Sequence, residues 1–163
     1  MNKKIIVRIA EGIGNQLFMY AHSYSLSKTI NYDLFIDNTS GYFMKKNQIR
    51  SYDLDKFNIN TTLSDKIYRF DTLFKNLNRN LLKKIDSFKK NKLFLLEERD
   101  KNKITKYNDT TKFNFSNVVF VEGYFESEKY FKNFENDLKA KFIINNKFIN
   151  KNNKFIELLR NYN

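Results

Sequence analysis

The residues best suited to bind a ligand lie near the N-terminus, where residues 11–16 read Glu-Gly-Ile-Gly-Asn-Gln. Glycines such as Gly12 and Gly14 allow turn angles closed to other residues and let the backbone approach a ligand closely. The carboxamides of Asn15 and Gln16 follow where a helical pattern begins, and the amide protons at a helix N-terminus point outward. These residue types at this spacing predict a binding site for a phosphate or a sugar.

The elements on either side of this segment must place it at the edge of a sheet. Residues 5–10 form an apolar run with β-branched side chains, which predicts a buried parallel strand. Residues 16–30 predict a helix with an apolar face, and residues 33–36 predict a second short strand. Because strand–helix–strand crossovers are right-handed, we expect the glycine segment at the end of the sheet where ligands bind.

Two other interpretations of the glycine segment stay open. A dinucleotide-binding fingerprint needs a third glycine three residues after Gly14, and that position holds the bulky Leu17. Asp33 and Asp37 do lie at about the right distance for an acidic residue that binds ribose. The segment could also be a purely structural turn, because glycine is the ordinary turn residue.

The rest of the chain predicts an α/β fold with an inserted helical region. The remaining expected elements are, in chain order, a polar loop at 37–49, one or two helices within 63–90, strands at 93–96 and 118–121, a helix at 126–141 and a polar linker at 145–154. The apolar positions assigned to the inserted helices are Ile67, Phe70, Leu73, Phe74 and Leu77. Ser127 is the expected N-cap of the helix at 126–141.

Composition sets limits on the class of protein. With 163 residues, of which 41% are hydrophobic, the chain is expected to form one domain with a sizeable core. The net charge of +12 comes largely from scattered lysines, which indicates a surface that attracts an anionic membrane surface weakly and binds no nucleic acid. The lack of cysteine excludes disulfides. The short N-terminal apolar run, interrupted by Arg8, predicts a cytoplasmic protein, peripheral at most at the inner face of the membrane.

Two further patterns are weak evidence for a metal site or a catalytic site. Asp53 and Asp55 form a string that could hold a divalent cation against a pyrophosphate, but such sites need more than two oxygen ligands. His22, the single histidine, lies in the middle of a predicted helix with no nucleophile or orienting carboxylate in view. We therefore expect no metal and no catalysis by histidine.

Three segments, in order along the chain, resemble glycosyltransferase family 11, the bacterial α-1,2-fucosyltransferases. Residues 7–21 resemble the family's opening strand and its Gly-Gly-Leu-Gly-Asn-Gln-hydrophobic-Phe-x-Tyr-Ala motif. Residues 50–59 resemble its Tyr-x-Leu-x-x-Phe-x-Ile stretch, and residues 123–131 resemble its Gly-Tyr-Trp-Gln-Ser-Glu-Lys-Tyr-Phe stretch. The departures from these patterns are Glu11 for Gly, Phe125 for Trp and Glu126 for Gln.

The resemblance implies the fold of a Rossmann-like N-terminal domain of a GT-B-type glycosyltransferase. Residues 1–144 would form this domain, and residues 145–163 a linker and helix leading to a donor-binding domain. The family's donor signature, His-x-Arg-Arg-x-Asp, has no counterpart in the chain, because His22 is followed by Ser and Tyr. We therefore expect the N-terminal half of a fucosyltransferase, inactive without its donor-binding half.

The reaction that the resemblance implies is the inverting transfer of L-fucose from GDP-fucose to the 2-hydroxyl of galactose in a surface glycan, without a metal or other cofactor. The partners are then GDP-fucose and a galactose-containing glycan acceptor. The alternative is a non-catalytic remnant that binds glycan or an anionic surface. Glu128 could contact substrate, or it could have a purely structural role, because acidic residues stabilise helix N-termini. The residues expected to contact substrate are Arg8, Gly12, Gly14, Asn15, Gln16, Tyr124, Ser127 and Glu128. No residue is assigned as catalytic.

Overall fold

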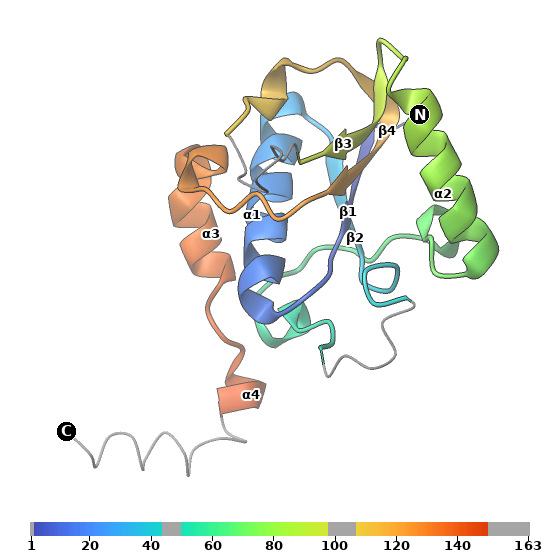
Figure 1. Ribbon diagram of the computed structural model, residues 1–163. Coiled ribbons are helices and arrows are strands. Elements are labelled where there is room, and N and C mark those ends of the chain that lie inside the picture. Colours follow the sequence, from blue (N-terminus) through green and yellow to red (C-terminus); the bar gives the residue numbers. More distant parts are fainter. Residues whose placement is uncertain (1, 44–49, 98–106, 150–163) are drawn as a thin grey trace.

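The computed structural model describes residues 2–43, 50–97 and 107–149, which fold around one parallel sheet (Figure 1). Its strands are β1 (Lys4–Arg8), β2 (Asp33–Asp37), β3 (Lys92–Leu96) and β4 (Phe115–Glu122). The sheet order is β2-β1-β4-β3, and every neighbouring pair is parallel. Parallel strands covered on both faces read as apolar runs, as the strongly buried side chains of β1 do. This α/β arrangement is compatible with a Rossmann-like fold.

Helices cover both faces of the sheet. α1 (Ile13–Ile30) and α3 (Glu135–Lys141) lie on one side, and α2 (Leu73–Asp86) lies on the other (Figure 1). A short α4 (Asn146–Ile149) follows α3. No helix within the described ranges is both long and apolar enough to cross a lipid bilayer.

The long helix α1 is buried although it carries many hydroxyl groups. Ser23 Oγ donates to Met19 O at 2.9 Å, and Ser27 Oγ donates to Tyr24 O at 2.8 Å. Bonds of this kind satisfy a serine inside a protein without any partner outside the helix. α1 ends at Asn31, whose φ of 56° is the left-handed conformation that closes many helices.

The predicted strands are confirmed, with shifts of one to a few residues at their ends. The first predicted helix ends at Ile30 as expected but begins at Ile13. Gly14 and Asn15 therefore lie in the first turn of α1 rather than in a loop before it, and Gln16 is helical as predicted. Of the inserted region at 63–90, only Leu73–Asp86 forms an α-helix, α2, so the assignment of Ile67 and Phe70 to a helix is wrong: Ile67 lies in a 3₁₀ turn, Lys66–Tyr68, and Phe70 lies between that turn and α2.

The prediction of a helix at 126–141 is wrong for the first half of that range. The chain there makes two 3₁₀ turns, Glu128–Tyr130 and Lys132–Phe134, and only then enters α3. The three-residue repeat of 3₁₀ geometry aligns side chains at i and i+3. Phe131 and Phe134 have this spacing, and their rings contact Phe18 and Tyr24 of α1 with centroids 6.0 and 6.1 Å apart. The packing of these two rings against α1 thus stabilises the 3₁₀ turns more than the local helix propensity stabilises an α-helix.

The expected linker at 145–154 is helical over its first residues, which form α4. The remainder of that linker, the end of the polar loop at 44–49 and the apolar pattern at 155–160 lie outside the described residues.

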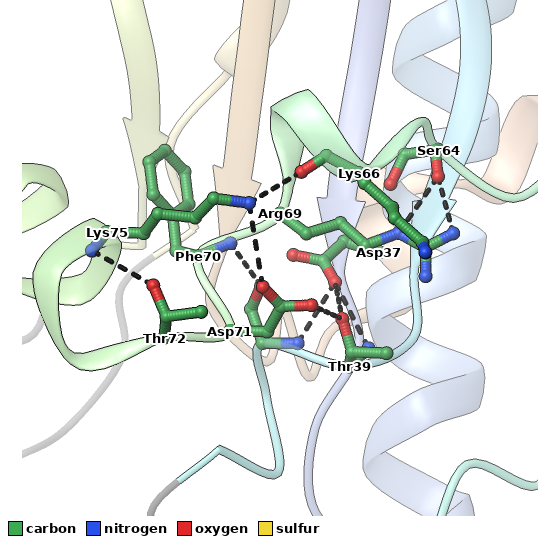
Figure 2. Close-up of polar contacts among 10 residues, drawn as sticks. Asp37, Thr39, Ser64, Lys66, Arg69, Phe70, Asp71, Thr72 and Lys75 are labelled. Carbon is green, nitrogen blue, oxygen red and sulfur yellow. Dashed lines mark hydrogen bonds and ion pairs between the residues drawn. The ribbon is translucent and has the colours of Figure 1, made fainter.

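Polar contacts join the loop after β2 to the chain entering α2 (Figure 2). Asp37 Oδ1 accepts from the backbone N–H groups of Thr39 at 3.1 Å and Ser40 at 3.0 Å. Ser40 Oγ in turn accepts from the N–H of Phe70 at 2.6 Å, and Thr39 Oγ1 donates to Asp71 Oδ2 at 3.2 Å. The end of β2 thereby fixes where α2 begins.

Candidate functional site

A cavity of about 440 Å³ lies where the carboxyl ends of β1, β3 and β4 meet. Parallel α/β sheets bind their ligands outside the carboxyl ends of the strands. The cavity lining includes Arg8, Glu11, Lys83, Glu97, Glu122 and Tyr124. The structure therefore brings together Arg8 and Tyr124, two of the predicted substrate contacts that lie far apart in the sequence.

A buried carboxylate, Glu122 at the end of β4, holds two cations of α2 beside this cavity. Arg79 donates from Nε to Glu122 Oε1 at 2.6 Å and from its terminal nitrogen to Oε2, and Lys83 Nζ donates to Oε2 as well. Burial acts to raise the pKa of Glu122, but the hydrogen bonds and charges of Arg79 and Lys83 outweigh it and hold that pKa below its ordinary value. Burial also lowers the pKa of Lys83, an effect that Glu122 partly offsets.

Arg8, at the end of β1, places a third cation beside the same cavity. Its terminal nitrogen donates to Ser40 O at 3.0 Å, while its buried Nε has no hydrogen-bond partner within the described residues. Burial lowers the pKa of Arg8, and the nearby Glu122 opposes that shift. Since a guanidinium remains protonated in proteins, Arg8 places a positive charge beside the cavity, and its buried Nε–H is left without a hydrogen-bond acceptor in the part of the chain that is described.

The other two carboxylates at the cavity have partners in the chain. Glu11 forms an ion pair with Arg50 at 2.8 Å. Glu97, just after β3, accepts from the backbone N–H groups of Tyr124 at 2.8 Å and Phe125 at 2.7 Å. Glu97 therefore positions the turn that carries Tyr124 into the cavity lining.

That turn contains two residues with positive φ, Gly123 at 153° and Phe125 at 53°. A Cβ atom on Gly123 would lie 2.3 Å from the Cβ of Glu97, so the space as well as the backbone conformation requires glycine. Phe125 is fully buried and stacks on His22 with ring centroids 3.7 Å apart. The strained turn is thus held from one side by Glu97 and from the other by the core.

The glycine segment differs from its expected geometry. The left-handed residue in the turn after β1 is Glu11, with a φ of 65°, whereas Gly12 is the extended N-cap of α1. A Cβ atom at Gly12 or Gly14 would meet nothing within 4 Å. Packing of the described chain therefore does not require either glycine, neither lines the cavity, and their contact with substrate stays a prediction.

Gln16 takes a role different from the one expected. Its side chain is completely buried, its Nε2 donates to Glu11 O at 2.9 Å and Ser51 O at 2.8 Å, and its Oε1 accepts from Asp53 N at 2.9 Å. Every hydrogen-bonding group of the carboxamide is occupied. Gln16 therefore positions the backbone around Ser51 instead of contacting a ligand, which corrects the prediction for this residue.

The remaining predicted contacts lie outside the lining of this cavity. Asn15 is partly buried in the first turn of α1. Ser127 Oγ accepts from Lys129 N at 3.4 Å, which confirms it as an N-cap, though of a 3₁₀ turn. Glu128 is exposed at the start of that turn, where a carboxylate favours the positive end of the backbone dipole. Contact of Asn15, Ser127 and Glu128 with substrate stays a prediction.

The three segments that carry the family resemblance meet around the N-terminal half of α1. Gln16 and Glu11 bind the second segment through Ser51, Asp53 and Arg50. The third segment contacts α1 through the Phe18–Phe131 pair described above and the His22–Phe125 stack. Segments separated by dozens of residues thus form one connected unit beside the cavity.

Neither His22 nor the two-aspartate string shows the geometry of a catalytic or metal site. His22 is buried, its Nε2 lies 3.0 Å from Thr110 Oγ1, and burial lowers its pKa to about 3. Asp53 pairs with Lys56 at 2.5 Å, and Leu54 between the two aspartates is fully buried. Within the described ranges, no three His, Cys, Asp or Glu residues cluster closely enough to hold a metal ion.

Sequence reasoning missed Glu122, Arg79, Lys83 and Glu97. For the two glutamates a usable signal was present, because each is the first acidic residue after an apolar strand and so falls at the ligand-binding edge of a parallel sheet. For Arg79 and Lys83 no signal existed, since their partner Glu122 is about 40 residues away in the chain.

Comparison with models of protein families, with curated proteins and with solved structures finds no match to this chain. An assignment of function therefore depends on the sequence segments and on the geometry of the cavity.

Proposed function

We propose that this domain is the acceptor-side, N-terminal half of an inverting α-1,2-fucosyltransferase of GT-B architecture. The full reaction would move L-fucose from GDP-fucose to the 2-hydroxyl of galactose in a surface glycan. The observation that carries the proposal is the cavity at the carboxyl ends of β1, β3 and β4, whose lining includes Arg8 and Glu11 of the first resembling segment and Tyr124 of the third.

The lining is chemically suited to a sugar. The ring of Tyr124 offers a surface for the apolar face of a hexose, and the guanidinium of Arg8, which also lines the cavity, attracts a hydroxyl or phosphate oxygen. Arg79 and Lys83 share their charge with Glu122, so Arg8 is the cation beside the cavity best placed to stabilise negative charge that develops on a departing diphosphate. The bidentate grip on the pyrophosphate itself is assigned to the donor-binding half.

Glu122 is a poor candidate for the base that activates the acceptor hydroxyl. Two cations contact its carboxylate and hold its pKa below the ordinary value, so its affinity for a proton at neutral pH is low. We assign Glu122 a positioning role, in which it fixes Arg79 and Lys83 of α2 against the sheet. The catalytic base is left unassigned.

Two titrations of the purified chain test the proposal. Saturation-transfer NMR with methyl β-galactoside should show contact, and Tyr124→Ala should abolish it while the matched Tyr107→Ala, a half-exposed tyrosine outside the cavity lining, leaves it intact. Calorimetry with GDP-fucose should give a dissociation constant no tighter than about 1 mM, or roughly −4 kcal/mol, and no turnover.

Each titration has a result that contradicts the proposal. Contact with the galactoside that survives Tyr124→Ala would remove the cavity as the acceptor site. Micromolar affinity for GDP-fucose, or any transfer by the chain alone, would mean that the donor site is also built from these residues.

A non-catalytic glycan-binding module is the second candidate, because a cavity of this kind can bind a glycan without a donor-binding half. The two candidate functions predict different coding sequences in the reading frame downstream. A strand that carries His-x-Arg in an adjacent frame supports the enzyme, and restored transfer on mixing the two products would establish it.

A further inference from the structure

Helix α2 faces its apolar side away from the protein. Its buried residues are Arg79 and Asp86, at 9% and 3% exposed surface, and both point toward the sheet side. The opposite side carries large apolar side chains that remain exposed, among them Phe74 at 80% and Leu77 at 68%. We call this surface the α2 face, defined as Leu73, Phe74, Leu77, Leu81, Ile85 and Phe88.

Polar contacts at both ends and in the middle of α2 fix this orientation. At the N-terminal end Lys75 Nζ donates to Lys66 O at 2.8 Å (Figure 2). In the middle Arg79 binds Glu122 through two hydrogen bonds. At the C-terminal end Asp86 accepts from the backbone N–H groups of Leu93 and Phe94 at 2.8 and 2.9 Å. Turning the apolar side inward would break all these bonds, so the exposed face is set by the fold.

The α2 face is too large and continuous to be ordinary surface. Phe74, Leu77, Leu81 and Ile85 recur every three or four positions, and a helix places such positions along one stripe, with Leu73 beside it at the start of α2 and Phe88 two residues after its end. In Figure 1 nothing in the part of the chain that is described covers the outer side of α2. Contiguous apolar stripes of this kind mark surfaces that bind a partner or a membrane.

The charges around the stripe identify the kind of partner. Between residues 66 and 92 the chain has nine Lys or Arg and only two Asp, and of the nine cations Arg79 and Lys83 are paired with Glu122 on the inner side of α2. Both aspartates are engaged, Asp71 with Thr39 and Lys75 and Asp86 with backbone N–H groups. Lys84, Lys89 and Lys90 are exposed beside the stripe, so its rim is positive.

We propose that the α2 face docks on the surface of an anionic lipid bilayer. The helix lies in the plane of the interface, the apolar stripe enters the boundary between headgroups and acyl chains, and the lysines contact lipid phosphates. A second copy of the chain fits less well, because it would bring two strongly basic rims together. Lys83 on the inner side of α2 lines the cavity, so docking holds the cavity about one helix diameter, ~10 Å, from the lipid.

This inference does not depend on the proposed function, and its test needs no sugar transfer. The chain has no tryptophan, so Phe88→Trp supplies a single fluorescent reporter at a side chain that is 92% exposed. Its emission should shift to shorter wavelength with vesicles of phosphatidylcholine and phosphatidylglycerol, and should not shift with phosphatidylcholine alone.

A matched pair of variants locates the contact. In vesicle co-sedimentation, the triple change Phe74→Ser, Leu77→Ser and Leu81→Ser should weaken binding to the anionic vesicles at least about thirtyfold, because it removes three large side chains from the interface. The control, Ile143→Ser with Ile144→Ser, alters exposed apolar residues beyond α3 and should leave binding unchanged. All substituted side chains are exposed, so both variants should retain the wild-type thermal unfolding curve.

Three results would overturn the inference. The first is a lack of binding to anionic vesicles, and the second is binding that the triple variant retains, which would assign it to scattered lysines. The third is sedimentation of the wild-type chain as a dimer that the triple variant converts to a monomer without any vesicle binding, which would assign the α2 face to a second copy.

Discussion

The buried histidine makes the stability of the domain depend on pH in a window where few other groups titrate. His22 has a folded-state pKa of about 3, against an ordinary value of 6.5, and the cause is burial against Phe125 and Tyr130. Below pH 6.5 the unfolded chain binds a proton that the folded chain does not bind. The free energy of unfolding therefore falls as pH is lowered from 6.5 toward 3, and His22 contributes no change above that range.

The expected magnitude follows from these two pKa values. Between pH 7 and pH 5 the linkage for one histidine amounts to about 2 kcal/mol of lost stability. For a chain of 163 residues this loss corresponds to a decrease in Tm of about 4–8 °C. Few other groups titrate between pH 5 and pH 7, because carboxylates titrate mainly below pH 5 and the terminal amine above pH 7.

Urea unfolding followed by far-UV circular dichroism at several pH values measures this slope. His22→Gln is the matched control, since a carboxamide can keep the hydrogen bond to Thr110 Oγ1 but cannot be protonated. The variant should show almost no change in stability between pH 7 and pH 5. An equal slope in wild type and variant, or an imidazole NMR signal of the folded protein that titrates near pH 6, would refute the assignment of a neutral buried ring.

Three more predictions concern the glycine segment and its surroundings. Gln16→Leu should lower the free energy of unfolding by about 2–4 kcal/mol in urea titrations, because buried backbone groups lose their partners, and a loss below about 1 kcal/mol would contradict the positioning role. Gly41→Ala should prevent stable folding, because its Cβ would lie 1.8 Å from the carbonyl oxygen of Ile9. Gly12→Ala is the matched control, because the new Cβ has open space around it, and this variant should unfold at nearly the wild-type temperature. Manganese or magnesium should not shift the melting temperature, and a saturable stabilisation that Asp53→Asn abolishes would show that the aspartate string does bind metal.

The strands and the edge that they present could be predicted from sequence, because each strand is a short apolar run and parallel strands end at a common edge. Arg8, at the end of the first predicted strand, and Tyr124, in the third segment that resembles the family, both fall at this edge, and their contact with substrate stays a prediction. The role of Gln16 could not be found, since its partners include backbone atoms at positions 51 and 53, which carry no sequence signal. Likewise Glu11 adopts a left-handed conformation that its residue type does not indicate.

The orientation of α2 shows a different limit of sequence reasoning. Its apolar periodicity predicts a helix correctly but also predicts that the apolar side is buried. The structure has the reverse, because Arg79 and Asp86 find buried partners on β4 and β3. Such contacts between distant parts of the chain decide which side of a helix faces inward, and no local pattern reports them.

The position of β4 has a consequence for synthesis on the ribosome. β4 is the last strand to be made, yet it lies between β1 and β3, which do not pair with each other. A nascent chain that ends before Phe115 therefore leaves one edge of β1 open and β3 without any neighbouring strand. The same chain lacks Glu122, so Arg79 and Lys83 have no counter-charge to seat α2.

Folding of the whole sheet must therefore wait for residues 115–122 to leave the exit tunnel. Until then the unpaired strand edges are open to aggregation, and they are natural binding sites for chaperones. Non-local pairing of this kind also slows folding. Fragments that stop short of β4 should consequently be captured by chaperones or degraded, and they should not accumulate as folded half-domains.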